Sequence, residues 1–437
     1  MLVLLVALVR LGLLAQEKLW SLRECCDYAV EHNISIKQQE NTRRQQELQL
    51  STAKNSRLPN LSASASQNFS FGRGLTAENT YSNTNTSSTS LQLGTSVPIF
   101  TGFQIPNQIK LNKLNLEAAT ADLEKAKNDI QMQVAQAYVQ ILYDLEIGDV
   151  ARRQIDIDSA QVARLQAFVD NGKASEAELS QQKATLAKSR LTATQADNNT
   201  RLAILALTQL LELPTPDGFA IVRPDLTVGD GFDVAIPSPD VIYAEAIGVK
   251  PEIAAQQLRL RGASHNIKIA QAAYLPTLSL NGGLGTNYYT TSGFKSDAFG
   301  TQLKNNFSQY IGLSLNVPIF NRFQTRNNVR NARIQQENQQ LQLDNTKKTL
   351  YKEIQQVYYN ALNAQTKEQS SLEALQSTKD AFKLMQAKYE NGKATITEFN
   401  EAKNNYLKSE SDLVQARYEN LYQKALIVFY RGHDLSF

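Results

Sequence analysis

LSASASQNFSF, residues 61–71, alternates apolar and polar side chains along its length. Its odd-numbered positions carry Leu, Ala and Phe with one Gln, whereas every even-numbered position is Ser or Asn. Successive side chains of an extended chain point to opposite faces, so a pattern of period two is typical of a β-strand. The stretch therefore predicts a strand with one apolar face and one polar face.

The same alternation recurs in three further stretches, at residues 90–99, 278–284 and 311–319. Four strands of about ten to twelve residues match the length that crosses a bilayer at a tilt, with the apolar side toward lipid. Polar segments rich in Asn, Ser and Thr, residues 76–88 and 290–305, separate the strands of each pair and suit exposed loops. Beyond the N-terminus no apolar run approaches the ~20 residues of a membrane helix, so strands must make any crossing.

The chain contains an internal duplication. A shift of 220 positions places VPIF at 97–100 on VPIF at 317–320, and NGKA at 171–174 on NGKA at 391–394, without a gap between them. Repetition at a fixed period indicates one structural unit used twice. The expected organisation is a signal peptide at 1–15, a first repeat of helix, two strands and a long helical hairpin at 16–213, a Pro-rich linker at 214–239 and a second repeat at 240–437.

Long helices follow the strands in each repeat. Between Asn321 and Asn391 there is neither Gly nor Pro, which predicts a helix of about 100 Å at 1.5 Å per residue. In the last helix apolar residues recur every seven positions from Leu407 to Val428, as in a coiled-coil seam. The NGK sequences interrupt the helical pattern, so each repeat is expected to fold back as an antiparallel hairpin with its turn there.

Composition excludes several classes of function. The chain has 45 Lys and Arg against 42 Asp and Glu, without the clustering of basic residues that marks nucleic-acid binding. Three His and two Cys lack the spacing of a metal site, so neither a metal nor another cofactor is expected. No nucleophile elbow or phosphate-binding loop is found, and an enzyme is not expected.

The N-terminal segment and the two cysteines also bear on location. Residues 1–15 contain an apolar core that ends in Leu14-Ala15-Gln16, which resembles a secretory signal and predicts export. Cys25 and Cys26 are neighbours, and a disulfide between neighbours requires strained geometry. We therefore expect two free, partly buried thiols on a helix, in preference to a lipidation site.

Four amphipathic strands cannot close around a lumen. An open edge inside lipid would leave backbone donors and acceptors unpaired, at a cost of several kcal/mol each. The chain is therefore expected to form an oligomer whose copies complete a barrel, while their helical hairpins surround the same axis as a second, longer cylinder. Solutes would pass through this cylinder passively.

The duplicated order of helix, two strands and two helices, with VPIF closing each strand pair and NGKAS or NGKAT at each hairpin tip, resembles the TolC outer-membrane efflux family over the whole mature chain. The resemblance implies a mainly α protein with a membrane β-barrel: a homotrimer with a twelve-stranded barrel in the outer membrane and a helical tube in the periplasm. It further implies a periplasmic adaptor and an inner-membrane pump as partners, contact with outer-membrane lipid, no nucleic acid, and a tip that closes like an iris.

The family motif at the hairpin tip implies a periplasmic gate. Glu398 and Glu401 lie six and nine positions after Gly392, and Glu178 lies six after the Gly of the first tip. Repeated by symmetry, these carboxylates would form a negative constriction that favours cations. Tyr389 matches a family position that latches neighbouring hairpins, with Glu178 as the expected partner. The competing interpretation is that acidic residues at helix N-termini only cap those helices.

The tip also carries the residues expected to meet the adaptor, because a turn at the end of a tube is what a partner contacts first. The family has a basic residue two positions after the second Gly, whereas this chain has Ala394, so the latch does not carry over intact. Ordinary turn chemistry is the competing interpretation. The expected contact residues are Asn171, Gly172, Lys173, Ser175, Asn391, Gly392, Lys393 and Thr395.

Two other classes of protein also contain helical hairpins. A periplasmic adaptor would add a compact domain rich in Gly and Val, which the sequence does not show. A coiled-coil scaffold without a pore would leave the four alternating stretches unexplained. The favoured function is thus the outer-membrane channel of a tripartite efflux or secretion system.

Overall fold

The computed structural model describes residues 19–75, 79–224 and 236–435, so the predicted signal peptide lies outside the described residues. The chain divides into two compact units. The sheet unit comprises Thr42–Thr120 and Ala255–Leu343, and the hairpin unit comprises Met1–Asn41, Ala121–Ala254 and Asp344–Phe437. Each unit draws on both halves of the chain, because two helices of 67 residues run from one unit into the other.

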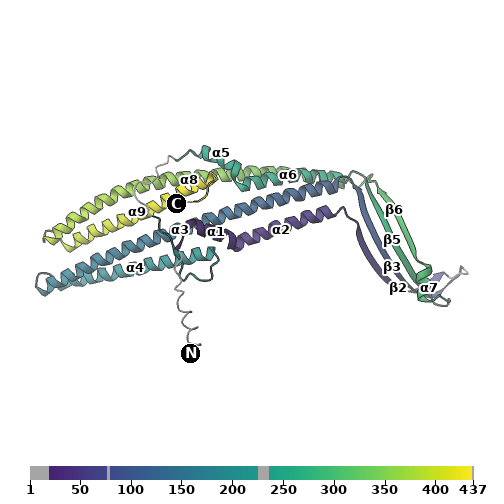
Figure 1. Ribbon diagram of the computed structural model, residues 1–437, viewed down its shortest axis with the longest axis horizontal. Coiled ribbons are helices and arrows are strands. Elements are labelled where there is room, and N and C mark those ends of the chain that lie inside the picture. Colours follow the sequence, from purple (N-terminus) through teal and green to yellow (C-terminus); the bar gives the residue numbers. More distant parts are fainter. Residues whose placement is uncertain (1–18, 76–78, 225–235, 436–437) are drawn as a thin grey trace, which may run out of the picture. The chain divides into compact units, whose positions relative to one another are not determined.

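The internal duplication is visible in the lengths of the helices. α3 (Gln104–Asp170) and α8 (Gln324–Glu390) each have 67 residues, as the prediction of helices about 100 Å long requires. α4 (Glu176–Leu210) and α9 (Ile396–Tyr430) each have 35 residues, and the bounds of all four helices obey the shift of 220. α4 returns beside α3 and α9 beside α8, so both predicted hairpins are present (Figure 1).

The shorter helices also have equal lengths in the two repeats, but the positions of their bounds differ by 217 instead of 220. α1 (Leu22–His32) and α5 (Pro239–Val249) have 11 residues each. α2 (Ile34–Asn55) and α6 (Pro251–Ala272) have 22 residues each. The helices that flank the strands and form the hairpins therefore correspond in the two repeats.

The sheet unit contains a four-stranded antiparallel sheet of order β2-β3-β5-β6 (Figure 1). Its strands are β2 (Asn60–Leu75), β3 (Tyr81–Thr101), β5 (Thr277–Thr291) and β6 (Ser308–Asn316). The register places Leu93 opposite both Ala63 and Leu284, so apolar residues share one face, as predicted.

The strands depart in detail from the sequence pattern. β2, β3 and β5 have 16, 21 and 15 residues, longer than predicted, because the polar residues before Ser88 pair with β2 instead of forming a loop. The last strand is shorter, with 9 residues, and Val317 and Ile319 lie beyond its end. A bulge between Pro98 and Phe100 takes Ile99 out of register, because Pro cannot donate to the ladder.

The outer connection between β5 and β6 is also more ordered than the predicted polar loop, since it contains the helix α7 (Phe299–Asn305). Gln302 holds this helix against β5: its side-chain amide accepts from Tyr289 N and donates to Tyr289 O, both at 3.0 Å. The side chain thus supplies the two hydrogen bonds that a neighbouring strand residue would make. α7 covers the edge of β5 where β6 no longer pairs with it.

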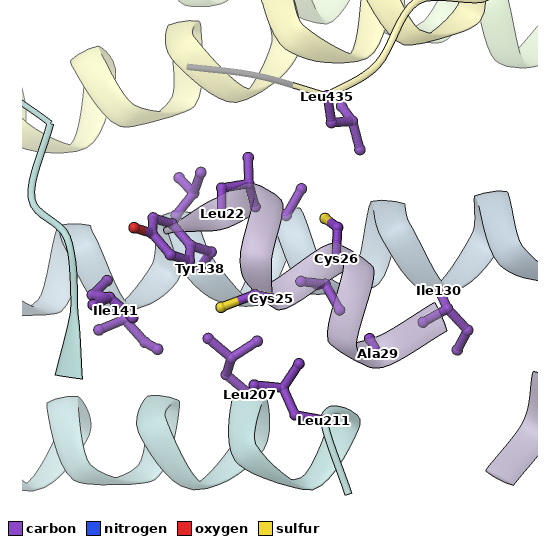
Figure 2. Packing of buried hydrophobic residues seen from close by; sticks show 14 of the residues in the cluster. Leu22, Cys25, Cys26, Ala29, Ile130, Tyr138, Ile141, Leu207, Leu211 and Leu435 are labelled. Carbon is purple, nitrogen blue, oxygen red and sulfur yellow. The ribbon is translucent and has the colours of Figure 1, made fainter. Parts of the chain in front are cut away.

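The core of the hairpin unit surrounds α1 (Figure 2). Cys25 is fully buried, Cys26 is 6% exposed, and neither is part of a disulfide, as predicted. Burial raises the pKa of Cys26 to about 12, and the nearby charge of Asp27 adds to the rise. These thiols therefore act as small apolar groups in the core.

Tyr138 of α3 closes the same core. Its hydroxyl lies 3.1 Å from Trp20 O and 2.7 Å from Val222 O. These carbonyls belong to, or directly follow, the short parallel strands β1 (Leu19–Trp20) and β4 (Ala220–Ile221). The Tyr138 hydroxyl therefore links α3 to Trp20, near the first described residue, and to Val222 in the predicted linker.

Candidate functional site: the hairpin tips

The two turns at the hairpin tips have the same backbone. Gly172 and Gly392 both have φ of +68°, in the left-handed region that favours glycine. Lys173 N donates to Phe168 O at 2.7 Å, and Lys393 N donates to Lys388 O at 2.8 Å. In each turn the residue after the glycine thus donates its backbone N–H to a carbonyl in the last turn of the helix. This arrangement is a Schellman motif, which ends a helix and satisfies carbonyl groups that have no partner within the helix.

Each returning helix begins with a capping box. The Ser175 hydroxyl accepts from Glu178 N at 3.2 Å, while the Glu178 carboxylate accepts from Ser175 N at 3.3 Å. Thr395 and Glu398 repeat the arrangement at 3.2 Å and 2.7 Å. Hydrogen bonds from Thr395 hold the pKa of Glu398 below its usual range. The capping interpretation of Glu178 and Glu398 is thus confirmed, and it leaves a gating role for their charges open.

The predicted adaptor-contacting residues all lie on the surface of the tips. The residues classed as exposed are Asn171, Gly172, Lys173, Ser175, Asn391, Gly392, Lys393 and Thr395. Glu401 is exposed as well, one turn of α9 beyond Glu398. The gate remains a prediction about the assembled channel.

Tyr389 of α8 lies against the start of α9. Its ring centroid lies 5.1 Å from that of Phe399 on α9. Burial raises the pKa of the Tyr389 phenol; the positive charge of Arg164 opposes this rise and the negative charge of Glu178 adds to it. The charge of Glu178 thus acts on the Tyr389 phenol, and the latch between these two residues stays a prediction.

Arg164 of α3 makes several contacts at the tips that the sequence did not predict. Its Nη2 donates to Glu390 O at 3.2 Å, and its Nη1 lies 3.6 Å from the Glu390 carboxylate. The guanidinium also lies over the rings of Phe168 and Tyr389, at 5.3 and 5.5 Å. A cation at the C-terminal end of α8 complements the helix dipole. Arg164 thus joins the first hairpin to the tip of the second.

Farther from the tip, a buried ion pair joins the two hairpins. Lys403 of α9 donates to Asp158 of α3, and both side chains are fully buried. The Asp158 carboxylate also accepts from Ser189 Oγ at 2.6 Å and from Gln182 Nε2 at 3.2 Å, both on α4. Asn400 Nδ2 donates to Gln182 Oε1 at 3.2 Å. We call these five residues the anchor cluster.

A signal for the anchor cluster exists in the sequence. Lys403 lies four residues after Phe399 and four before Leu407, two apolar positions that the structure buries. A lysine in the middle of an apolar stripe needs a buried partner. Nothing in the sequence identifies Asp158 as that partner, because 245 positions separate the two residues.

Other kinds of site are not indicated. Among residues 19–75, 79–224 and 236–435, no group of three or more His, Cys, Asp and Glu side chains is placed to hold a metal ion. The helices of this described part include none with the length and apolar character of a membrane span.

Comparisons with known proteins agree with this architecture. Over 251 residues the chain is 24% identical to the outer membrane efflux protein BepC of Brucella suis biovar 1, a match that covers 56% of this chain and 50% of BepC. The chain thus spans about half the length of that curated relative. Its fold is similar to the crystal structure of a membrane protein from Pseudomonas aeruginosa, with TM-score 0.79, 20% identity and coverage of 96% and 92% of the two chains.

A second solved structure has nearly the same degree of similarity. The outer membrane protein VceC from Vibrio cholerae aligns with TM-score 0.77 and 18% identity, over 95% of this chain and 97% of VceC. A model of the family described as outer membrane efflux protein matches residues 26–212 and 242–429, which include both hairpins and all four strands of the sheet. The chain therefore belongs to the outer membrane efflux protein family.

Proposed function

We propose that this chain is one protomer of a homotrimeric outer-membrane channel that gives solutes passive passage from a periplasmic adaptor and pump to the exterior. The observation that carries the proposal is the sheet, whose apolar face is uncovered in the protomer. Leu61, Phe71 and Ile311 on that face are 73%, 76% and 79% exposed. A side-chain layer of this kind requires an apolar solvent, which a lipid bilayer supplies.

The opposite face and the edges of the sheet support the same proposal. Ser64, Gln92 and Gly285 share a row of the polar face, as expected for a wall that lines water. β2 and β6 are the edge strands of this sheet, and inside lipid their free backbone groups must pair with sister copies. Eight strands from two copies would give a barrel that side chains fill, whereas twelve strands from three copies leave room for a lumen.

Aromatic side chains at both ends of the strands also fit a position in the bilayer. Phe69 and Phe71 lie toward one end of the sheet, whereas Phe100 and Phe103 form an edge-to-face pair, 5.3 Å between centroids, at the other. Aromatic girdles flank the apolar band of outer-membrane barrels.

The oligomer and its membrane association can be tested together. Membranes that contain the protein are washed with alkaline carbonate and then dissolved in mild detergent, and the native mass of the complex is measured. We expect retention in the membrane and a mass of three copies of the chain without the predicted signal peptide, residues 1–15. A monomer released by carbonate would refute the proposal and favour a pore-free scaffold or adaptor.

The gate is proposed at Glu398 and Glu401, with Glu178 of the first tip. In planar bilayers we expect small, cation-preferring currents that grow in Glu398→Gln/Glu401→Gln, because the substitution removes charge from the constriction while Gln can still complete the capping box. The control is Thr395→Ala, which breaks the same cap and keeps the charge. Equal currents in wild type and the double variant would remove the gate assignment.

The proposed adaptor surface is the exposed face of the two turns. Lys173 and Lys393 project from it beside Asn171 and Asn391. We expect Lys173→Glu/Lys393→Glu to abolish efflux in cells without changing the conductance of the purified channel. Unchanged efflux would exclude these lysines from the contact.

A further inference from the structure

The segments where the strands of the sheet meet α2, α3, α6 and α8 carry a strong excess of positive charge (Figure 1). They contain eleven Lys and Arg and no Asp or Glu, although the whole chain has 45 basic and 42 acidic residues. All of them belong to the sheet unit. We call these segments the basic belt, and they comprise residues 48–59, 102–116, 255–276 and 317–336.

The charges of the belt lie on the surface. Lys110, near the start of α3, and Arg330, near the start of α8, are both exposed. Because the belt contains no carboxylate, its basic side chains have no acidic partner within it. One ion pair crosses the border of the belt, where Lys113 Nζ lies 3.8 Å from the carboxylate of Glu117. Both side chains of this pair are largely exposed, so it contributes little.

The two repeats place basic residues at corresponding positions of the belt. Under the shift of 220, Lys110 corresponds to Arg330 and Lys113 to Arg333. The type of side chain changes at both positions, whereas the positive charge stays. In the proposed trimer each position therefore occurs six times around the channel axis, and the charges form a ring.

The arginines of α8 share one face of the helix. Arg326, Arg330 and Arg333 are spaced by four and three residues, so their side chains are neighbours on the helix surface. Val329 and Ala332, which directly precede two of them, are buried. The arginines thus lie beside the packed stripe of α8 and remain free to meet a ligand from outside the protomer.

Exposed aromatic rings lie directly beside this face. Phe320 and Phe323 form an edge-to-face pair, 5.5 Å between centroids, and are 70% and 58% exposed. They correspond to Phe100 and Phe103 of the first repeat. The Arg326 guanidinium lies 5.8 Å from the centroid of the Phe323 ring. Aromatic rings at the ends of barrel strands lie at the boundary of the bilayer, so the arginine face begins at that boundary.

The basic groups lie at the depth of lipid headgroups. At 1.5 Å per residue, Arg326 lies about 3 Å beyond the first residue of α8, and Arg330 about 9 Å. The headgroup layer of one leaflet is about 5–8 Å thick. Helical side chains lean toward the N-terminus, which for α3 and α8 is the end at the sheet. The charged ends of Lys110 and Arg330 therefore extend toward the headgroups, as snorkelling side chains do.

On the basis of the proposed channel, we propose that the basic belt binds the phosphate groups of anionic phospholipids in the periplasmic leaflet. Arginine donates paired hydrogen bonds to phosphate oxygens, and basic residues beside a membrane span attract anionic lipid. The adjoining aromatic rings favour a lipid over an anionic glycan or solute, because only a lipid also covers apolar surface. A ring of bound headgroups would fix the depth of the barrel in the membrane.

The test compares two lipids that differ in charge. The purified complex in neutral detergent is titrated with phosphatidylglycerol or with phosphatidylcholine of the same acyl chains, and bound lipid is counted by native mass spectrometry. We expect the wild type to bind phosphatidylglycerol more tightly than phosphatidylcholine. Lys110→Gln/Arg330→Gln should raise the Kd for phosphatidylglycerol about fivefold and leave that for phosphatidylcholine unchanged.

A matched control comes from the hairpin unit. Lys188 and Lys408 are exposed and also correspond under the shift of 220, but they lie on α4 and α9, outside the belt. Lys188→Gln/Lys408→Gln should leave both Kd values unchanged, and an equal loss in this variant would overturn the proposal. Lys110→Arg/Arg330→Lys keeps both charges and should keep the preference for phosphatidylglycerol.

The same spectra separate the belt from the channel. Trimers that bind the two lipids equally would overturn the belt proposal and leave the channel proposal intact, whereas absence of trimers would refute the channel proposal itself. Sedimentation with purified peptidoglycan tests the anionic glycan as ligand. Co-sedimentation that Lys110→Gln/Arg330→Gln abolishes, with an unchanged preference between the lipids, would assign the belt to the glycan and overturn the lipid proposal.

Discussion

Lys403→Met isolates the contribution of the anchor cluster to stability. Met has a similar length and is apolar, so it fills the site of the lysine without its charge. The Asp158 carboxylate then keeps its hydrogen bonds from Ser189 and Gln182 but loses its counter-charge in a site that is fully buried. Removing one partner of a buried ion pair in this way costs about 3–5 kcal/mol.

Two further variants serve as controls for the cost of Lys403→Met. Asp158→Asn/Lys403→Met removes both charges while an amide remains to hydrogen-bond with Ser189 and Gln182, so it is expected to cost much less than Lys403→Met alone. Arg153→Gln/Glu410→Gln removes the other ion pair between the same helices. Because the Arg153 side chain is about half exposed and that of Glu410 is 19% exposed, this pair is only partly buried, and its loss should cost less than breaking the fully buried pair.

The assay is the thermal midpoint of the helical signal by circular dichroism, in one detergent and at one scan rate. A cost of 3–5 kcal/mol corresponds to roughly 6–20 °C for a unit of 150–250 residues. The reasoning is refuted if Lys403→Met melts with the wild type. It is also refuted if the melting temperature of Asp158→Asn/Lys403→Met falls by the sum of the decreases in Asp158→Asn and Lys403→Met alone. Either result would mean that the charge of Lys403 does not stabilise the buried charge of Asp158.

Three other outcomes follow from the hairpin tips and the core. Tyr138→Phe leaves two partly buried carbonyl groups without the phenol hydroxyl and should cost about 1 kcal/mol in the same melting assay. Gly392→Ala forces a side chain onto a backbone at φ +68° and should destabilise the second hairpin by about 1 kcal/mol, seen as faster amide exchange at the tip. The lowered pKa of Glu398 stabilises the start of α9 above the unfolded-state value of 4.5, and this stabilisation is lost as pH falls through the folded-state pKa. The protection of amides in the first turn of α9 against exchange, relative to their intrinsic rates at each pH, should therefore fall in acid, and Glu398→Gln should abolish that pH dependence.

Features set by neighbouring residues could be predicted from the sequence. The alternation after Leu61 produces a two-faced strand, and the glycines at 172 and 392 end their helices, because each depends on a few adjacent residues. The shift of 220 predicted two equivalent hairpins, which the equal helix lengths confirm. The capping boxes at the starts of α4 and α9 could likewise be predicted, because Glu178 and Glu398 each lie three residues after Ser175 or Thr395.

Tertiary structure alone decided which distant side chains meet. The Pro98 bulge, the cover that α7 places over β5, and the contacts of Arg164 and Glu390 all depend on how separate elements pack. Asp158 and Lys403 show this most clearly, since 245 positions separate them and corresponding residues of the other repeat carry one charge instead of two. Local sequence determines the strands, helices and turns, because their hydrogen bonds and side-chain periodicity are short-range. The burial of a charge depends on the register between helices, which only the packed chain defines.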